Sequence, residues 1–157
     1  MTSQSFGDRA YAALTRSSDP AGANIAFILA SVGMTGWPHI ALLSRGEIGV
    51  IAPDLLRIAL HAGSQTTANL IKAGRATLFV AEAGTVVTVE LCTELDGSVE
   101  IAGRRLNVFD AQMTQSREHS VPYATVVSGI TFKLHEPRLT TARWMETQEA
   151  LMRRPCV

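Results

Sequence analysis

Charge is scarce in this sequence, and neither sign prevails. Only 18% of the 157 residues are charged, and 14 lysines and arginines balance 14 aspartates and glutamates. A nucleic-acid-binding domain, or a protein held on an anionic membrane surface, normally carries an excess of positive charge. The composition therefore predicts neither a nucleic-acid partner nor a membrane partner.

Cysteine and histidine are also few, and their spacing fits no metal site. The two cysteines, Cys92 and Cys156, lie far apart, and the four histidines form no HxH or HExxH pattern. We expect Cys92 to be a small core residue and Cys156 to be an exposed thiol, with a disulfide between them as the open alternative. The absence of GxSxG, CxxC and GxxxxGK[ST] motifs removes sequence support for a hydrolase, a thiol redox enzyme or a P-loop NTPase.

Long apolar runs are missing as well. The apolar stretch 25–32 is too short to cross a bilayer, and the opening MTSQSFGDRAYAAL has neither the basic region nor the apolar region of a signal peptide. We therefore expect one cytoplasmic domain that spans residues 1–157. Apolar residues make up 46% of the chain, which predicts additional surface to bury against another subunit.

What the sequence does contain is a compact unit of strand, helix and strand. Apolar side chains recur at every second position over 56–60, as in a strand with one buried face. Ser64 is a suitable N-cap for a helix over 65–73, and Gly74 is a suitable end for it. The chain then returns as a strand over 75–81.

The start of this predicted helix is a candidate anion site. Helix N-termini carry unpaired N–H donors and a partial positive charge, so the Ser64-Gln65-Thr66-Thr67 opening offers hydroxyls and amides to a phosphate. The alternative is that Ser64 only caps its own helix and that Thr66 and Thr67 are solvated. His61, at the end of the preceding strand, either neutralises phosphate charge or simply terminates the strand.

Periodicity predicts the remaining elements. We expect a helix over 5–14, strands over 24–33, 38–45, 48–52, 85–95, 98–102, 104–112 and 123–134, and a helix from about 140 to 153. Asp96-Gly97 is typical of a hairpin turn, and the polar segment 113–122 is expected to be a loop. Ala142, Met145, Glu149 and Met152 follow helical spacing along one face of the last helix.

Three further features have alternative interpretations. Arg57 is expected to reach solvent or an ion pair between subunits. Trp37 either lies against a ligand ring or packs beside a turn, and packing is the commoner role. The charged triplet 117–119 invites a catalytic interpretation, but a solvated loop is the commoner case.

Two segments of the chain resemble the pyridoxamine 5'-phosphate oxidase-like family of FMN-binding split barrels. The first is Pro38-His39-Ile40-Ala41-Leu42-Leu43-Ser44, and the second runs from Gly63-Ser64 through Asn69 to Arg75-Ala76-Thr77-Leu78. The resemblance implies a mainly β fold with a few helices, built as a six-stranded antiparallel Greek-key split barrel. It also implies a homodimer with an FMN in each of two clefts between the subunits. The implied FMN-binding residues, with His61 added from its position, are His39, Ile40, Ala41, Leu42, Ser44, His61, Ser64, Thr66, Thr67 and Asn69.

The sequence departs from the oxidase itself at four cationic positions, where this chain has His39, Ser44, Gln65 and Thr66. The resemblance therefore implies an FMN-binding oxidoreductase that acts on a small molecule or electron donor, rather than the vitamin-synthesising enzyme. The alternatives are a non-catalytic homodimer that binds a flavin or another phosphate-bearing ligand, and a haem or deazaflavin user on the same barrel. A flavin brings its own redox chemistry, so no catalytic residue is assigned.

Overall fold

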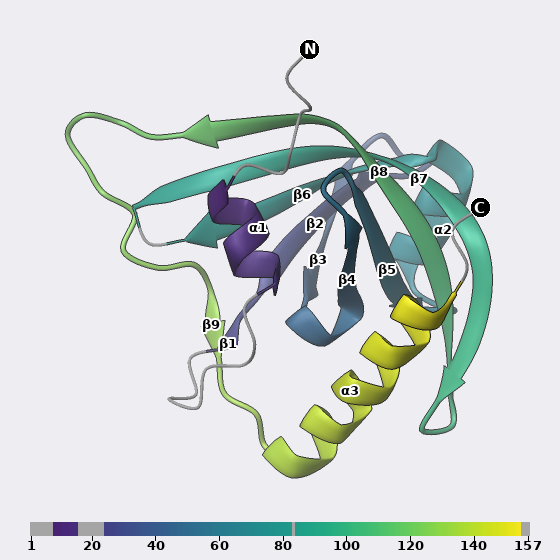
Figure 1. Cartoon of the computed structure of the whole chain (residues 1–157). Coiled ribbons are helices and arrows are strands. Elements are labelled where there is room, and N and C mark those ends of the chain that lie inside the picture. Colours follow the sequence, from purple (N-terminus) through teal and green to yellow (C-terminus); the bar gives the residue numbers. More distant parts are fainter. Residues whose placement is uncertain (1–7, 16–23, 83, 155–157) are drawn as a thin grey trace.

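The structure is a computed structural model, and it describes residues 8–15, 24–82 and 84–154 (Figure 1). The helices are α1 (Asp8–Thr15), α2 (Gln65–Ala73) and α3 (Pro137–Arg153), and a 3-10 turn, η1, covers Arg45–Glu47. The strands are β1 (Asn24–Ile25), β2 (Phe27–Val32), β3 (Pro38–Leu43), β4 (Ile48–Ala52), β5 (Leu55–His61), β6 (Arg75–Glu82), β7 (Thr85–Ile101), β8 (Arg104–His119) and β9 (Thr131–Phe132). None of the helices in these ranges has the length and apolar character needed to cross a membrane.

Seven strands form one antiparallel sheet in the order β3-β2-β6-β7-β8-β5-β4, and β1 pairs with β9 in a separate two-stranded sheet. The two edge strands, β3 and β4, are joined through η1 alone, so the sheet curls until its edges approach each other (Figure 1). The predicted mainly β, antiparallel split barrel is confirmed. The described residues form nine strands rather than six, because the short β1 and β9 lie outside the main sheet and the edges are divided more finely.

The core fills the inside of this curled sheet. Alternate residues of each strand point inward, among them Leu29, Leu78, Val89 and Phe109, all with 0% exposure. The period-two pattern of β5 is confirmed, but both faces of this strand are buried rather than one. The outer face is covered because α3 packs there, with Leu151 against Ala59 and Val108.

The β7–β8 hairpin corrects the turn expected at Asp96-Gly97. β7 continues through these residues, and its register with β8 shifts between Leu95 and Gly97, which marks a bulge. The turn lies at Ala102-Gly103, where both residues have positive φ, 49° and 76°. An Asp-Gly pair is compatible with a hairpin turn and with a β-bulge. Pairing with β8 decides that it forms a bulge here.

The structure differs most from the prediction over residues 113–134, from the second half of β8 to β9. Residues 113–119, expected to be a loop, extend β8 because they pair with β7, with His119 opposite Val86. Most of the strand expected over 123–134 is irregular, and only Thr131–Phe132 is a strand. Tyr123 and Val127 are 87% and 86% exposed, so an apolar run here does not indicate burial within the chain.

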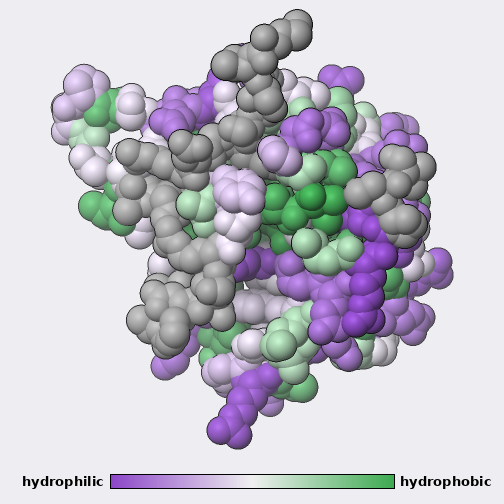
Figure 2. All heavy atoms as spheres, viewed as in Figure 1, coloured by the Kyte–Doolittle hydropathy of each residue, from purple (hydrophilic) through white to green (hydrophobic). Residues whose placement is uncertain are grey.

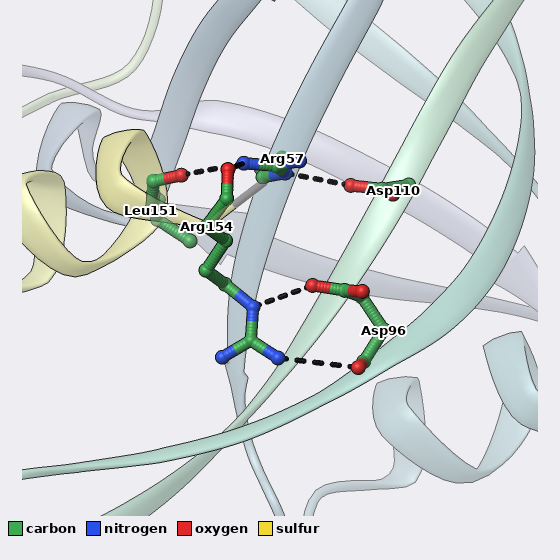
Figure 3. A network of polar contacts seen from close by, with 5 residues as sticks. All are labelled: Arg57, Asp96, Asp110, Leu151 and Arg154. Atoms are coloured by element: carbon green, nitrogen blue, oxygen red, sulfur yellow. Dashed lines mark hydrogen bonds and ion pairs between the residues drawn. The ribbon is translucent and has the colours of Figure 1, made fainter. Parts of the chain in front are cut away.

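A buried polar network anchors the C-terminal helix (Figure 3). Arg57, expected at the surface, is 0% exposed, and its Nε donates to Asp110 Oδ1 over 2.8 Å. Its Nη1 donates to the carbonyl oxygens of Leu151 and Arg154 over 2.9 and 2.6 Å, at the end of α3 where carbonyls lack helical partners. Arg154 in turn donates to the Asp96 carboxylate and carbonyl oxygens. The network therefore fixes α3 against the outer face of the sheet.

Two smaller predictions are also corrected. The face of α3 that was expected from spacing is exposed at all four positions, while Thr147 and Leu151 are buried. Cys92 is exposed, because it lies on the outer face of β7 and alternates with the buried Leu91. Cys156 lies outside the described residues.

Candidate functional site

The start of α2 is capped as the sequence predicts. The Thr67 amide donates to Ser64 Oγ over 3.1 Å, and Gly74 ends the helix at φ 65°. Ser64 Oγ donates to Thr67 Oγ1 over 3.0 Å, and Thr67 Oγ1 donates to the His61 carbonyl oxygen over 2.8 Å. Two of the three hydroxyls proposed for the anion site thus have partners within the chain. In the alternative interpretation, the Ser64 cap is confirmed, whereas the expected solvation of Thr66 and Thr67 is wrong, since they are 3% and 1% exposed.

The backbone at this helix start retains donors. The Ser64 and Thr67 amides bond to His61 O and Ser64 Oγ, whereas the amides of Gln65 and Thr66 occupy first-turn positions that have no acceptor within a helix. Such amides, with the helix dipole, attract an anion. Anion binding here would therefore rest on backbone donors more than on hydroxyls.

A chain of side-chain hydrogen bonds ties α2 to the β2–β3 hairpin. Gln65 Nε2 donates to Asn69 Oδ1 over 2.8 Å, and Asn69 Nδ2 donates to Ser31 Oγ over 3.1 Å. Asn69 also fills the space over Gly33, where a Cβ would lie 2.3 Å from its Oδ1. Ser31 pairs in register with His39, so the two segments that carry the family resemblance lie together.

The two faces of β3 differ in exposure. His39 and Ala41 are half-buried on the inner face, opposite Ser31 and Leu29 of β2. Ile40 and Leu42 point outward and are 54% and 57% exposed. The four predicted site residues on β3 therefore divide between a face that meets α2 and an apolar outer face.

The apolar outer face continues across neighbouring strands. Leu42 pairs with Ile28, Ile28 with Phe79, and Phe79 with Thr88, so these side chains form one row across β3, β2, β6 and β7. None of the four is charged. Trp37, at the start of the same hairpin arm, is 78% exposed, so the expectation that it packs within the chain is not met.

The residue after β3 is held by a buried carboxylate. Ser44 donates to Glu47 Oε2 through its amide, over 2.6 Å, and through its hydroxyl, over 3.0 Å. Burial raises the pKa of the Glu47 carboxyl above its ordinary value of 4.5, and the hydrogen bonds from Ser44 offset part of that rise. Ser44 thus has a structural partner in this chain.

His61 and Arg105 flank the loop that leads into α2. His61 is exposed, and its Nδ1 accepts a hydrogen bond from the Gly63 amide over 3.2 Å. The Ala62 amide donates to the Arg105 carbonyl oxygen over 3.0 Å, which places this exposed arginine beside the same loop. Sequence analysis missed Arg105, because no local signal reveals a residue brought in by pairing of β5 with β8.

Comparison with known proteins supplies one clear sequence relative. No protein-family model matches the chain. The uncharacterised protein YclD of Bacillus subtilis is 33% identical over 129 residues, which make up 82% of this chain and 83% of YclD.

Solved structures share the fold at low sequence identity. An FMN-binding protein from Syntrophomonas wolfei matches with a TM-score of 0.52 and 16% identity, covering 74% of this chain and 87% of that one. HupZ of Group A Streptococcus matches with a TM-score of 0.52 and 10% identity, over 67% and 90%. A candidate pyridoxamine 5'-phosphate oxidase from Lactobacillus delbrueckii matches with a TM-score of 0.51 and 16% identity, over 59% and 84%.

The chain belongs to the same protein family as YclD, and its fold is the split barrel shared with the FMN-binding protein and the candidate pyridoxamine 5'-phosphate oxidase.

Proposed function

We propose that this protein is an FMN-binding homodimeric flavoprotein that acts as an oxidoreductase on a small molecule or electron donor. The observation that carries the proposal is the link from Gln65 through Asn69 to Ser31, which brings the start of α2 to the inner face of β3. A helix start with unpaired amides beside an edge strand suits a ligand with a phosphate tail and a flat ring. The FMN-binding protein of Syntrophomonas wolfei has the same fold, which supports the choice of cofactor.

The residues present fit this cofactor, although with fewer cations than expected. The amides of Gln65 and Thr66 would hold the phosphate, His61 and the backbone of Arg105 flank the loop before them, and β3 would run along the ring. The hydroxyls of Ser64 and Thr67 would contribute through their support of the helix start. When bound, FMN supplies hydride or electron transfer, and the chain binds and orients it.

The homodimer is supported by the apolar outer face of the sheet. Ile40 and Leu42 are large, apolar and more than half exposed, and they continue into the row through Ile28 and Phe79. A contiguous apolar patch of this kind usually marks a contact with another protein. We infer a second copy as the partner because Leu42, Ile28 and Phe79 are uncharged, and the first charged side chain in the row is Arg117 of β8, opposite Thr88.

One observation favours a second candidate function, a flavin-binding protein without turnover. Several hydroxyls of the predicted site already have partners in the chain, and the first turn of α2 has no acidic or basic side chain. Weak phosphate binding suits a carrier or a reversible binder. Reduction of the bound flavin by NADH or NADPH distinguishes the two, because only an oxidoreductase turns over.

The decisive experiment compares FMN with riboflavin, which lacks the phosphate. Fluorescence quenching should give tighter binding for FMN, and the protein as isolated should show flavin absorbance. Gln65→Arg adds a cation at an exposed first-turn position and should tighten FMN binding about 5- to 20-fold, the effect of one charge-assisted hydrogen bond. Riboflavin affinity should stay unchanged.

Gln65→Met is the matched control, because it removes the same bond to Asn69 without adding charge. It should leave the ratio of FMN to riboflavin affinity as in the wild type. Equal affinity for FMN and riboflavin in the wild type, with no response to Gln65→Arg, would place the phosphate elsewhere. Failure of both flavins to bind would overturn the proposed cofactor.

A further inference from the structure

A cavity of about 510 Å³ lies between α3, η1 and β4 on one side and the end of α1, β1 and β9 on the other. Figure 1 shows α3 crossing the open end of the barrel, and Figure 2 shows the surface hollowed beside it. The volume lies within the usual range for small-molecule sites. No described residue of α2 or β3 lines it, so the cavity is separate from the proposed flavin site.

Specific contacts fix two walls of this cavity, α3 and η1, relative to each other. Gln148 Nε2 donates to the carbonyl oxygens of Arg45 and Ile48 over 2.8 and 2.7 Å, which fixes the distance between α3 and η1. Trp144 lies so close to Gly46 that a Cβ there would be 2.1 Å from its Cγ. The hydrogen bonds of Arg57 fix the other end of α3. The cavity is therefore preformed, and α3 cannot settle into it without breaking these contacts.

The lining favours an aromatic ligand. Trp144 and Phe132 meet edge to face, with ring centroids 6.3 Å apart and an interplanar angle of 89°, so they offer a ring face and a ring edge at right angles. Met145 and Met152 also line the cavity and are 61% and 58% exposed. Thioether side chains are adaptable and make favourable contacts with aromatic rings.

The charge of the lining points to a neutral ligand. Among the described lining residues, Arg45 and Glu149 carry charge, and their signs are opposite. The lining has no net charge, so it could not offset the free-energy cost of removing a charged ligand from water. We propose that this cavity binds a neutral aromatic molecule of two or three rings, stacked against Trp144, whether or not a flavin is bound elsewhere.

The test uses N-phenyl-1-naphthylamine, a neutral two-ring-system probe that brightens in apolar surroundings. The chain has two tryptophans, so a Trp37→Phe background leaves Trp144 as the single emitter, at little risk because Trp37 is 78% exposed. We expect saturable binding of one probe per chain, with energy transfer from Trp144 to the probe. FMN should not displace the probe, which separates this result from success or failure of flavin binding.

Charged substitutions in the cavity wall test whether the probe binds in this cavity. Met145→Lys and Met152→Lys, both at exposed positions, should each weaken probe binding about tenfold or more while urea unfolding stays close to wild type. Leu139→Lys is the matched control on the same helix, at a 53% exposed position outside the lining, and should bind as the wild type does. Absence of saturable energy transfer, equal loss in Leu139→Lys, or loss with Leu42→Lys on the outer face of β3 would each overturn the proposal.

Discussion

At the scale of single residues, Glu47 is a carboxyl whose surroundings oppose its charge. Burial raises its pKa above 4.5, so the folded chain holds the proton more tightly than the unfolded chain does. Its stabilising contribution is then fully present below the unfolded pKa and is lost as pH rises through the folded pKa. Two hydrogen bonds from Ser44, both to Oε2, offset part of the free-energy cost of burying the ionised carboxylate.

Glu47→Gln should therefore stabilise the protein relative to the wild type increasingly as pH rises from about 4.5 towards 7. The amide oxygen of glutamine can accept the same two bonds, and the charge is gone. Urea unfolding of both proteins across this pH range measures the difference, in which contributions from other titrating groups cancel. Glu146→Gln, at an exposed position of α3, is the control, and a Glu47→Gln difference that is constant with pH would contradict the prediction.

At the scale of elements, the attachment of α3 depends on one buried arginine. Arg57→Met keeps a similar length of side chain but leaves the Asp110 carboxylate and the carbonyl oxygens of Leu151 and Arg154 without this donor. Removing one member of a buried polar network typically costs about 3–5 kcal/mol. We expect a loss of this size in the free energy of unfolding and faster hydrogen exchange in the last turns of α3.

Arg153→Ala is the matched control, since the side chain of Arg153 is 78% exposed and pairs only with Glu149 on the helix surface in the described contacts. Exposed pairs of this type contribute about 0–1 kcal/mol. If Arg57→Met changed stability and exchange no more than Arg153→Ala does, the network would not be what holds the helix.

At the scale of the whole molecule, the outer face of β3, β2, β6 and β7 is expected to be covered by a second copy. The wild type should sediment at twice the chain mass of 16.9 kDa. Leu42→Glu places a charge among apolar side chains of the expected interface, so it should shift the protein towards monomer. Sedimentation velocity at micromolar concentration measures both.

Leu139→Glu, at a position of similar exposure on α3, should leave the association unchanged. A wild type that sediments as a monomer across this concentration range would remove the dimer from the proposal. Flavin affinity, measured on the same samples, should fall with Leu42→Glu if the cofactor lies between the copies.

The sequence by itself determined the local features. The Ser64 cap, the helix Gln65–Ala73 and its end at Gly74 were predicted to the residue, because each depends on a side chain or backbone angle within one or two turns. Strands β3 to β6 followed from alternation of apolar residues and nearby turns in the same way. The family resemblance rests on these local segments.

Only the tertiary structure decided the roles of residues whose partners are distant in the sequence. Arg57 became a buried anchor because α3, 94 residues later, brings the Leu151 carbonyl to it. Residues 113–119 became a strand because β7 was there to pair with them, and Asp96-Gly97 became a bulge for the same reason. Hydroxyls that looked available to a ligand found acceptors in their own chain. A polar group satisfies its hydrogen bonds with whatever packing brings near, and the local sequence does not contain that neighbour.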